Sequence, residues 1–436
     1  MRLEDVLTQS QRVAEEAECF LVRSQQTPVG FEANRLKMLE TKESSSVSLR
    51  IIKDGKIGLA TTSGLDDPRA LVAMAVETAQ FGAEARFLFP QGQRYPQVDC
   101  FDPAVEQVAI EEMVEMGGAL ISRLLAHTPE LLCDAGVTRG TVEVTMLNSR
   151  GGAASYRKSL FSVGVEGTLV RGTDMLFVGD MDSSCRPIQE IEHLAQAVTR
   201  QLELARDTAS VRSGDLPAVF THHGVRSAFF SSLALALNGK MVYQEASPLA
   251  GRQGERVLDE HLTVWDDATI AYRPASRPCD DEGMPSRRTP LVRNGVVTQF
   301  LYDLQTAALA GAQSTGNGSR AGGGVPMPSV AALTIDEGDT TFEAMVRDMR
   351  EGLVIEQLIG AEQGNVLGGE FSGNVLLGYK VENGQIVGRV KDTMVSGNIY
   401  DVLKGLVAIG SEARWVGGSL RTPALYVPRL AVASKA

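Results

Sequence analysis

Asparagine–glycine and aspartate–glycine pairs separate segments of alternating polarity in this chain. Asp54-Gly55 lies between Val47–Ile51 and Lys56–Ala60, two segments that read as strands. Such a pair between alternating segments is the strongest short-range signal of a β-hairpin. We therefore expect antiparallel sheet near the start of the chain and again towards its end. Further turns of this kind are expected at Asn294-Gly295, Asn383-Gly384 and Ser396-Gly397-Asn398.

Apolar residues at helical spacing predict helices between these strands. Residues 1–29 carry Leu3, Val6 and Phe20 in such a pattern, and we expect an amphipathic helix there. Pro68 fits the first turn of a helix over 67–83. The remaining expected elements are helices over 108–127, 187–206, 224–238 and 340–352, strands over 131–148 and on to 178, and a linker over 88–104.

The length of 436 residues is too great for one ordinary core. The pattern predicts an α+β protein whose N-terminal region forms hairpins and helices in two subdomains, 1–104 and 105–212. Ser213–Asp215 breaks a helix before the apolar strand 216–220, so the main boundary is expected near 212. Residues 213–436 are expected to form a mostly antiparallel, curled or barrel-like β domain with a few helices.

Charge and composition argue against several classes of function. The formal net charge is −12, and the tightest basic groups are only Arg157-Lys158 and Arg287-Arg288. Binding to a phosphate backbone needs clustered basic residues, so a nucleic-acid partner is disfavoured. The sequence has no apolar run near the roughly 18 residues that a membrane span needs. The acidic start, Met1–Asp5, does not resemble a signal peptide, and we expect a cytoplasmic protein with no membrane partner.

The cysteines and histidines do not form a metal pattern. The cysteines are odd in number and widely spaced, which argues against disulfides and thiolate zinc sites. They are Cys19, Cys100, Cys133, Cys185 and Cys279. Neither His-Glu-x-x-His nor a histidine pair at i, i+4 occurs, and His222-His223 is interpreted as part of a turn or interface.

Two local clusters remain as candidates for chemistry. Asp280-Asp281-Glu282 could hold a divalent cation or act in general acid–base work, although three consecutive carboxylates usually form a solvated turn. The second cluster is glycine-rich, from Ser314 through Gly316, Asn317, Gly318 and Arg320 to Gly324. It matches neither a P-loop nor a dinucleotide fingerprint. A functional loop and a flexible connection both remain open.

Several motifs in order make the chain similar to the TldD/PmbA family, and the resemblance covers most of the chain. The motifs are Leu49–Gly58, Cys279–Ser286, Asn294–Val296, Phe300–Asp303, Ser314–Arg320, Pro326–Pro328, Gly368–Gly373, Gly378–Gly384 and Ser396–Asn398. The resemblance implies a pair of related subunits that form a cytosolic metalloprotease. The older family name is modulator of DNA gyrase.

In that family, the TldD type supplies zinc ligands from a His-Glu-x-x-x-His helix and a cysteine near the C-terminus, and the PmbA type, also called TldE, lacks them. Aligned on Leu237–Gly239, the helix positions fall on about Phe230, Ser231 and Leu235, none of which can hold zinc. The segment 411–418 contains no cysteine. This chain therefore resembles the PmbA/TldE type, with no catalytic or metal residue and no cofactor of its own.

The resemblance implies that zinc belongs to a TldD-like partner and that the complex degrades or trims unfolded peptides. This chain would then shape the substrate chamber. The candidate chamber residues are Gly316, Asn317, Gly318, Arg320, Gly369, Glu370, Phe371 and Ser372. One alternative is a homodimer that binds peptides like a chaperone, without proteolysis. A second alternative is a stand-alone hydrolase that uses Asp280, Asp281 and Glu282.

Overall fold

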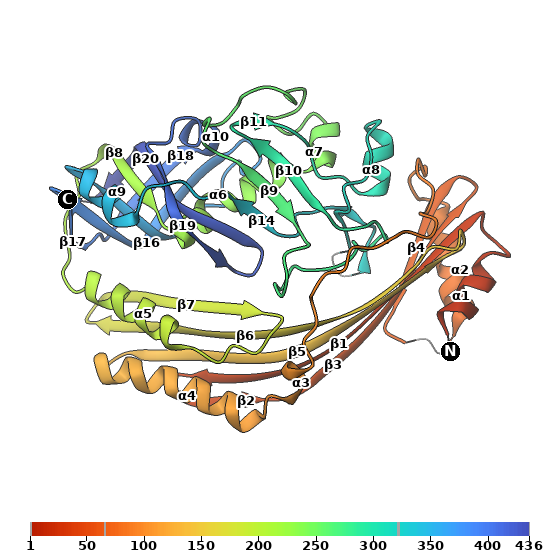
Figure 1. The fold of residues 1–436 in the computed structure, drawn as a ribbon, viewed down its shortest axis with the longest axis horizontal. Helices are drawn as coiled ribbons and strands as arrows, with labels where there is room; N and C mark the ends of the chain where they lie inside the picture. Colours follow the sequence, from red (N-terminus) through yellow and green to blue (C-terminus); the bar gives the residue numbers. More distant parts are fainter. Residues whose placement is uncertain (1, 65–66, 321–322, 436) are drawn as a thin grey trace.

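The computed structural model describes residues 2–64, 67–320 and 323–435, and it has two layers (Figure 1). The first half of the chain forms a long curved sheet, and the β-rich second half lies over this sheet. The two ends of the chain lie at opposite ends of the molecule. The α+β class is confirmed.

The first sheet contains seven strands in the order β4-β3-β1-β5-β6-β7, with β2 paired to β1. Neighbouring strands are antiparallel throughout. The predicted hairpin is confirmed, because Asp54 and Gly55 adopt positive φ angles of 50° and 72° between β3 and β4. The strands are β1 (Glu16–Glu32), β2 (Arg35–Leu39), β3 (Lys42–Lys53), β4 (Lys56–Thr62), β5 (Leu132–Asn148), β6 (Ala153–Arg171) and β7 (Asp174–Ser184).

The predicted helix over residues 1–29 is wrong beyond its first turns. Helix α1 spans only Leu3–Ser10, and β1 begins at Glu16. This strand lies in the middle of the sheet, with β3 on one side and β5 on the other. Residues 17–21 are consecutively buried. A strand that is buried on both faces carries consecutive apolar residues instead of alternating apolar and polar ones. Its sequence pattern therefore cannot be told from that of a buried helix.

Helices cover the two ends of the first sheet (Figure 1). Helices α1 and α2 (Pro68–Ala79) pack on the end that carries Leu49 and Ile51. At the other end, α4 (Ile110–His127) and α5 (Glu192–Leu204) pack on β5, β6 and β7. The helices predicted over 67–83, 108–127 and 187–206 are confirmed with shorter bounds, and α3 (Ala104–Gln107) adds one turn.

Strands from both predicted subdomains, 1–104 and 105–212, belong to this one sheet, because β1 pairs with β5 over Glu18–Phe31. Residues 88–103 between them contain neither helix nor strand. Phe89 in this segment is buried against Ile52 and Ile57. The linker is therefore packed on the sheet.

The second half contains a closed barrel, as the sequence predicts. Its strands are β8 (Gly214–Phe220), β15 (Glu351–Ile359), β16 (Glu370–Glu382), β18 (Thr393–Asn398) and β20 (Leu420–Ser434). They form a ring because β20 pairs with β8 as well as with β18. Helix α6 (His222–Ala236) packs against β15, β19 and β20. The helix predicted over 224–238 is confirmed.

Shorter elements extend the barrel. The strands are β9 (Val264–Asp267), β10 (Arg288–Arg293), β11 (Val296–Val297), β12 (Gly318–Ser319), β13 (Met327–Pro328), β14 (Leu333–Ile335), β17 (Gln385–Arg389) and β19 (Ala408–Val416). The helices are α7 (Gly239–Tyr243), α8 (Leu304–Leu309), α9 (Phe342–Asp348) and α10 (Ile399–Val402). The turns at 294–295 and 383–384 are confirmed. The turn predicted at 396–398 is wrong, since Asn398 ends β18 and caps α10 through the amide of Tyr400.

The two layers share a core. Along β8, Ala218 and Phe220 face the interior of the barrel, and Val219 between them packs with residues of the first sheet and its helices. Alternation thus gives the barrel wall two buried faces. In the part of the chain that the structure describes, each helix is too short or too polar to cross a membrane.

Candidate functional site

The acidic cluster forms a buried turn. Asp280 is fully buried, and its carboxylate accepts hydrogen bonds from the amides of Glu282 and Met284, both at 2.9 Å, and of Gly318 at 2.7 Å. The amide of Asp281 in turn donates to the Gly318 carbonyl at 3.0 Å. These bonds join the acidic cluster to the glycine-rich segment, two features that lie more than thirty residues apart in the sequence.

From Ser314 to Arg320, the glycine-rich segment is closely packed against its neighbours and is not a flexible connection. A Cβ atom on Gly318 would lie 2.6 Å from the Glu282 carboxylate, and Gly316 has a φ of 76°. Asn317 donates from Nδ2 to the carboxylate of Asp266 at 2.6 Å. Residues 321 and 322 of the segment lie outside the described residues.

Four charged side chains join the two layers beneath this turn. Arg50 of β3 contacts Glu18 of β1 at 3.1 Å and Glu282 of the acidic turn at 2.6 Å. Arg320 also pairs with Glu18, and its amide donates to Asp281 at 2.8 Å. All four members, Glu18, Arg50, Glu282 and Arg320, are buried. We call this group the interlayer network.

Sequence reasoning missed Glu18 and Arg50. The one available signal was Arg50 itself, a charged residue inside the apolar strand around Leu49 and Ile51. A charge in such a place needs a partner, because an unpaired buried charge is costly. The sequence does not say that the partner is Glu282, which lies 232 positions away.

Burial shifts the pKa values of the acidic turn and of Arg50. It raises the pKa of Asp280 and of Glu282 above the usual carboxyl range, against the attraction of Arg277 and Arg50 respectively. Burial opposes the charge of Arg50, but Glu18 and Glu282 keep its pKa above the ordinary value. These carboxyl groups face arginines and backbone amides, so the geometry gives them a bonding role between the layers.

Helix α6 carries Phe230, Ser231 and Leu235, the residues that the family resemblance compares with zinc ligands of the TldD type. The Arg226 guanidinium stacks over the Phe230 ring at 3.9 Å from its centroid. Ser231 hydrogen-bonds through its hydroxyl to Glu362, and the side chain of Leu235 is exposed. Zinc needs several nitrogen, oxygen or sulfur ligands, and these residues do not fit it. Among the residues that the structure describes, His, Cys, Asp and Glu form no group of three that could hold a metal ion.

The second set of chamber candidates lies at the start of β16, beside the loop 360–369. Phe371 is buried in an aromatic cluster with Phe220 and Phe229, at centroid distances of 6.3 and 5.6 Å. Gly369 has a φ of 83°, and a Cβ there would lie 2.4 Å from the Tyr400 ring. Glu370 and Ser372 alternate with Phe371 and are exposed. Of the eight chamber candidates, only these two present an exposed side chain.

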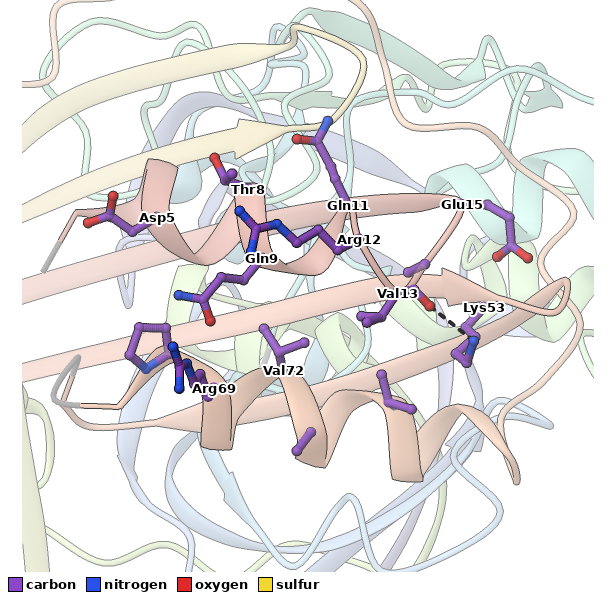
Figure 2. Close-up of a pocket in the computed structure, with 14 residues that line it drawn as sticks. Asp5, Thr8, Gln9, Gln11, Arg12, Val13, Glu15, Lys53, Arg69 and Val72 are labelled. Atoms are coloured by element: carbon purple, nitrogen blue, oxygen red, sulfur yellow. Dashed lines mark hydrogen bonds between the residues drawn. The ribbon is translucent and has the colours of Figure 1, made fainter.

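A groove lies elsewhere, between α1 and α2 (Figure 2). It is open, with a volume of about 1240 Å³. Val13 and Val72 give it apolar surface, Arg12 and Arg69 lie along it, and Lys53 donates to the Val13 carbonyl at 3.0 Å. None of the residues predicted from the sequence to be functional borders this groove.

Comparisons with known proteins agree on a single family. The model of the PmbA/TldA metallopeptidase C-terminal domain matches residues 213–434, and the model of domain 1 matches residues 17–79. An uncharacterized protein of Methanocaldococcus jannaschii is 26% identical over 94% of this chain and 95% of its own. A protein of Methanothermobacter thermautotrophicus named metalloprotease is 26% identical over 87% of this chain and 84% of its own.

The fold also matches solved structures. The crystal structure of TldE from Thermococcus kodakarensis aligns with a TM-score of 0.90 at 22% identity, over 99% of this chain and all of the other. At this identity the likeness concerns the fold. Together with the family models, it places both layers of this chain in one known architecture.

Proposed function

Because the chain belongs to the PmbA/TldD metallopeptidase family, we propose that it is the TldE-like subunit, without zinc, of a two-subunit metalloprotease. A TldD-like relative supplies the metal and the reacting groups. The observation that carries this proposal is the surface of α6. Phe230 lies under Arg226 and Ser231 is bonded to Glu362, at positions aligned with zinc ligands. The chain keeps the helix of the TldD type but lacks the side chains that would donate to zinc.

The role of this subunit is to shape the chamber in which an unfolded peptide is cut. The bond between Ser231 and Glu362 holds the loop 360–369 against α6. Glu370 and Ser372 extend that surface along β16. Extended peptides bind at such surfaces mainly through main-chain hydrogen bonds, with little dependence on sequence.

We place this complex in the cytoplasm. All five cysteine thiols are free and buried, which fits a reducing compartment. Cell fractionation with an antibody to this chain tests the location, and recovery with secreted protein would contradict it.

The central experiment combines this chain with a relative from the same organism that carries His-Glu-x-x-x-His. We expect the two to co-elute in size-exclusion chromatography and to cleave an unfolded fluorogenic peptide much faster than either alone. The matched control replaces one zinc-ligand histidine of the partner by alanine, which should abolish cleavage and keep co-elution. Cleavage by this chain alone with added zinc would overturn the proposal, as would a partner that is fully active and does not co-elute. Peptide binding by this chain alone, without cleavage in the mixture, would favour the homodimeric peptide binder.

A substitution on β16 tests the proposed chamber surface. Glu370→Lys reverses an exposed charge on β16 and is expected to change the KM for the peptide and leave co-elution intact. Glu112→Lys makes the same change at an exposed position of α4 and should leave the KM unchanged. Equal effects of both variants would place the chamber elsewhere on the chain.

A further inference from the structure

A cleft of about 560 Å³ lies between the two layers. Phe230, Ser231 and Leu235 do not line it, whereas residues 411–416 of β19 do. It is bordered by β7 and α5 of the first layer and by β15, β16, β19 and the start of α6 of the second. His223 at its wall lies seven residues before Phe230 on α6, which is roughly 10 Å along the helix axis. The cleft thus borders the start of α6, about two turns before the surface proposed for the chamber.

The inner end of the cleft gathers two carboxylates around one imidazole. Asp180 of β7 lies 3.3 Å from Nε2 of His223, so this pair spans the two layers. Glu356 of β15 lines the same end. Burial lowers the pKa of His223, but Asp180 and Glu356 outweigh it and keep this pKa above the ordinary value. Burial raises the pKa of Glu356, against the attraction of His223, so a bound cation would favour the charged form of this carboxyl group.

Tyr379 completes this end. Its side chain is 1% exposed, it borders the cleft, and its hydroxyl has no hydrogen-bond partner in the described part of the chain. The register pairs Tyr379 with Val354, two residues before Glu356 and on the same face of the barrel wall. A buried hydroxyl without a partner costs about 1–3 kcal/mol. A ligand that bonds to it recovers this cost.

The positive groups nearby have partners of their own. Arg200 of α5 lies 3.6 Å from Glu343 and 5.6 Å from the centroid of Phe342. Arg273 lies 4.0 Å from Asp182 and 5.1 Å from the centroid of Trp415. Burial lowers the pKa of His222 to about 4, so this imidazole is neutral at neutral pH. Asp180 is paired with His223, whereas Glu356 has no ion pair within 4 Å in the described part of the chain. Glu356 is therefore the carboxyl group at the inner end that is open to a cation.

We propose that this cleft binds a small organic cation through a primary ammonium or guanidinium group. The cation sits among Asp180, Glu356 and the Tyr379 hydroxyl, which accepts one of its N–H hydrogen bonds. Trp415 and Phe342 offer aromatic surface to the organic part of the ligand. The same chemistry occurs in a free amine and in the amino terminus of a peptide.

The test titrates the whole chain with L-leucinamide and with the tripeptide Leu-Gly-Gly amide, by calorimetry and by thermal shift. We expect saturable binding of at least one probe and a melting temperature that rises with its concentration. The N-acetylated forms of both probes lack the cation and should not bind. Binding of leucinamide alone indicates a free amine as the ligand, and binding of the tripeptide alone indicates a peptide terminus.

Variants separate the site from general effects. Glu356→Gln is expected to weaken binding roughly 10–100-fold, because a charge-assisted hydrogen bond is lost. Tyr379→Phe removes only the hydroxyl and should weaken binding several-fold without lowering the melting temperature of the free protein. It therefore tests the site even if Glu356→Gln fails to fold. Glu203→Gln, exposed on α5, should leave the affinity unchanged.

Three outcomes would overturn the proposal. The first is equal binding of the acetylated and free probes. The second is absence of saturable binding by either amine at millimolar concentration. The third is binding of inorganic phosphate in the cleft with loss on Arg200→Ala, which would make it an anion site.

Discussion

Nη1 of Arg50 lies 2.6 Å from Oε1 of Glu282, and this contact connects the first sheet to the acidic turn of the second layer. The guanidinium also lies 4.8 and 4.9 Å from the ring centroids of Phe87 and Phe89, in the segment that links the two subdomains. Three parts of the chain thus meet at one side chain. The acidic motif supplies Glu282 and the glycine-rich motif supplies Arg320 to the buried contacts between the layers.

Arg50→Met is expected to destabilise the protein by about 3–5 kcal/mol, since it leaves Glu18 and Glu282 buried without their shared partner. Urea unfolding followed by circular dichroism measures the change. Arg86→Met removes an exposed arginine that pairs with Glu84 at 2.6 Å and should cost less than about 1 kcal/mol. Equal losses in the two variants would show that the interlayer network carries no special stability.

Gly318→Ala is expected to destabilise the protein by about 1–3 kcal/mol through overpacking. The added Cβ would lie 2.6 Å from the Glu282 carboxylate and would disturb its contact with Arg50. Gly136→Ala on β5 is the control, because a Cβ there meets no atom within 4 Å. Thermal unfolding of both variants measures the difference, and a Gly318→Ala protein as stable as the control would contradict the packing of this segment.

Two adjacent glycines of α4 should respond to alanine in opposite directions. A Cβ on Gly117 would lie 2.4 Å from the Phe31 ring, whereas a Cβ on Gly118 meets nothing within 4 Å. Gly118→Ala is expected to stabilise the protein by about 0.5–1 kcal/mol, because alanine is the better helix former. Gly117→Ala should lower the melting temperature. The same sign for both would contradict the close approach of Gly117 to Phe31 of β1.

His222 should make the protein less stable in acid. Burial lowers its pKa from 6.5 to about 4 in the folded protein. The unfolded chain therefore takes up a proton first as the pH falls, and the free energy of unfolding decreases between about pH 6.5 and 4. His222→Gln keeps a hydrogen-bond donor for the Glu412 carbonyl, which lies 3.2 Å from Nε2.

The expected result is that the variant loses about 1–3 kcal/mol less than the natural protein over this pH interval, measured by urea unfolding at several pH values. His223 acts in the opposite sense, because its pKa is raised, so its stabilising effect is lost as the pH rises through that value. His223 is present in both proteins, so its contribution to the free energy of unfolding cancels when the two are compared. Parallel pH profiles would contradict a neutral His222 in the folded state.

The elements that the sequence predicts correctly depend on neighbouring residues. Asp54-Gly55 and Asn383-Gly384 adopt the positive φ angles of tight hairpin turns, a preference of these residue types themselves. Helices α2 and α4 likewise follow from local spacing and capping, such as the Asp67 side chain that accepts from two amides of the first turn.

The first long strand illustrates what local patterns do not contain. Residues 17–21 fit helical spacing, yet they lie in β1 because β3 and β5 pair with it on both sides. Pairing partners up to 130 residues away decide between the two structures. No local preference in the segment itself selects the strand.

The sequence by itself determined the hairpin turns at 54–55, 294–295 and 383–384, most of the helices and the β-rich second half, because each follows from residues close together in the chain. Only the tertiary structure decided that Asp280, Glu282 and Gly318 are buried, that Arg50 is the partner of Glu282 across the layers, and that His223, Glu356 and Tyr379 border one cleft. Burial and pairing between distant segments depend on how whole layers pack. They also set the charge state of a carboxylate or an imidazole, and thereby decide whether such a group bonds two layers or faces a ligand.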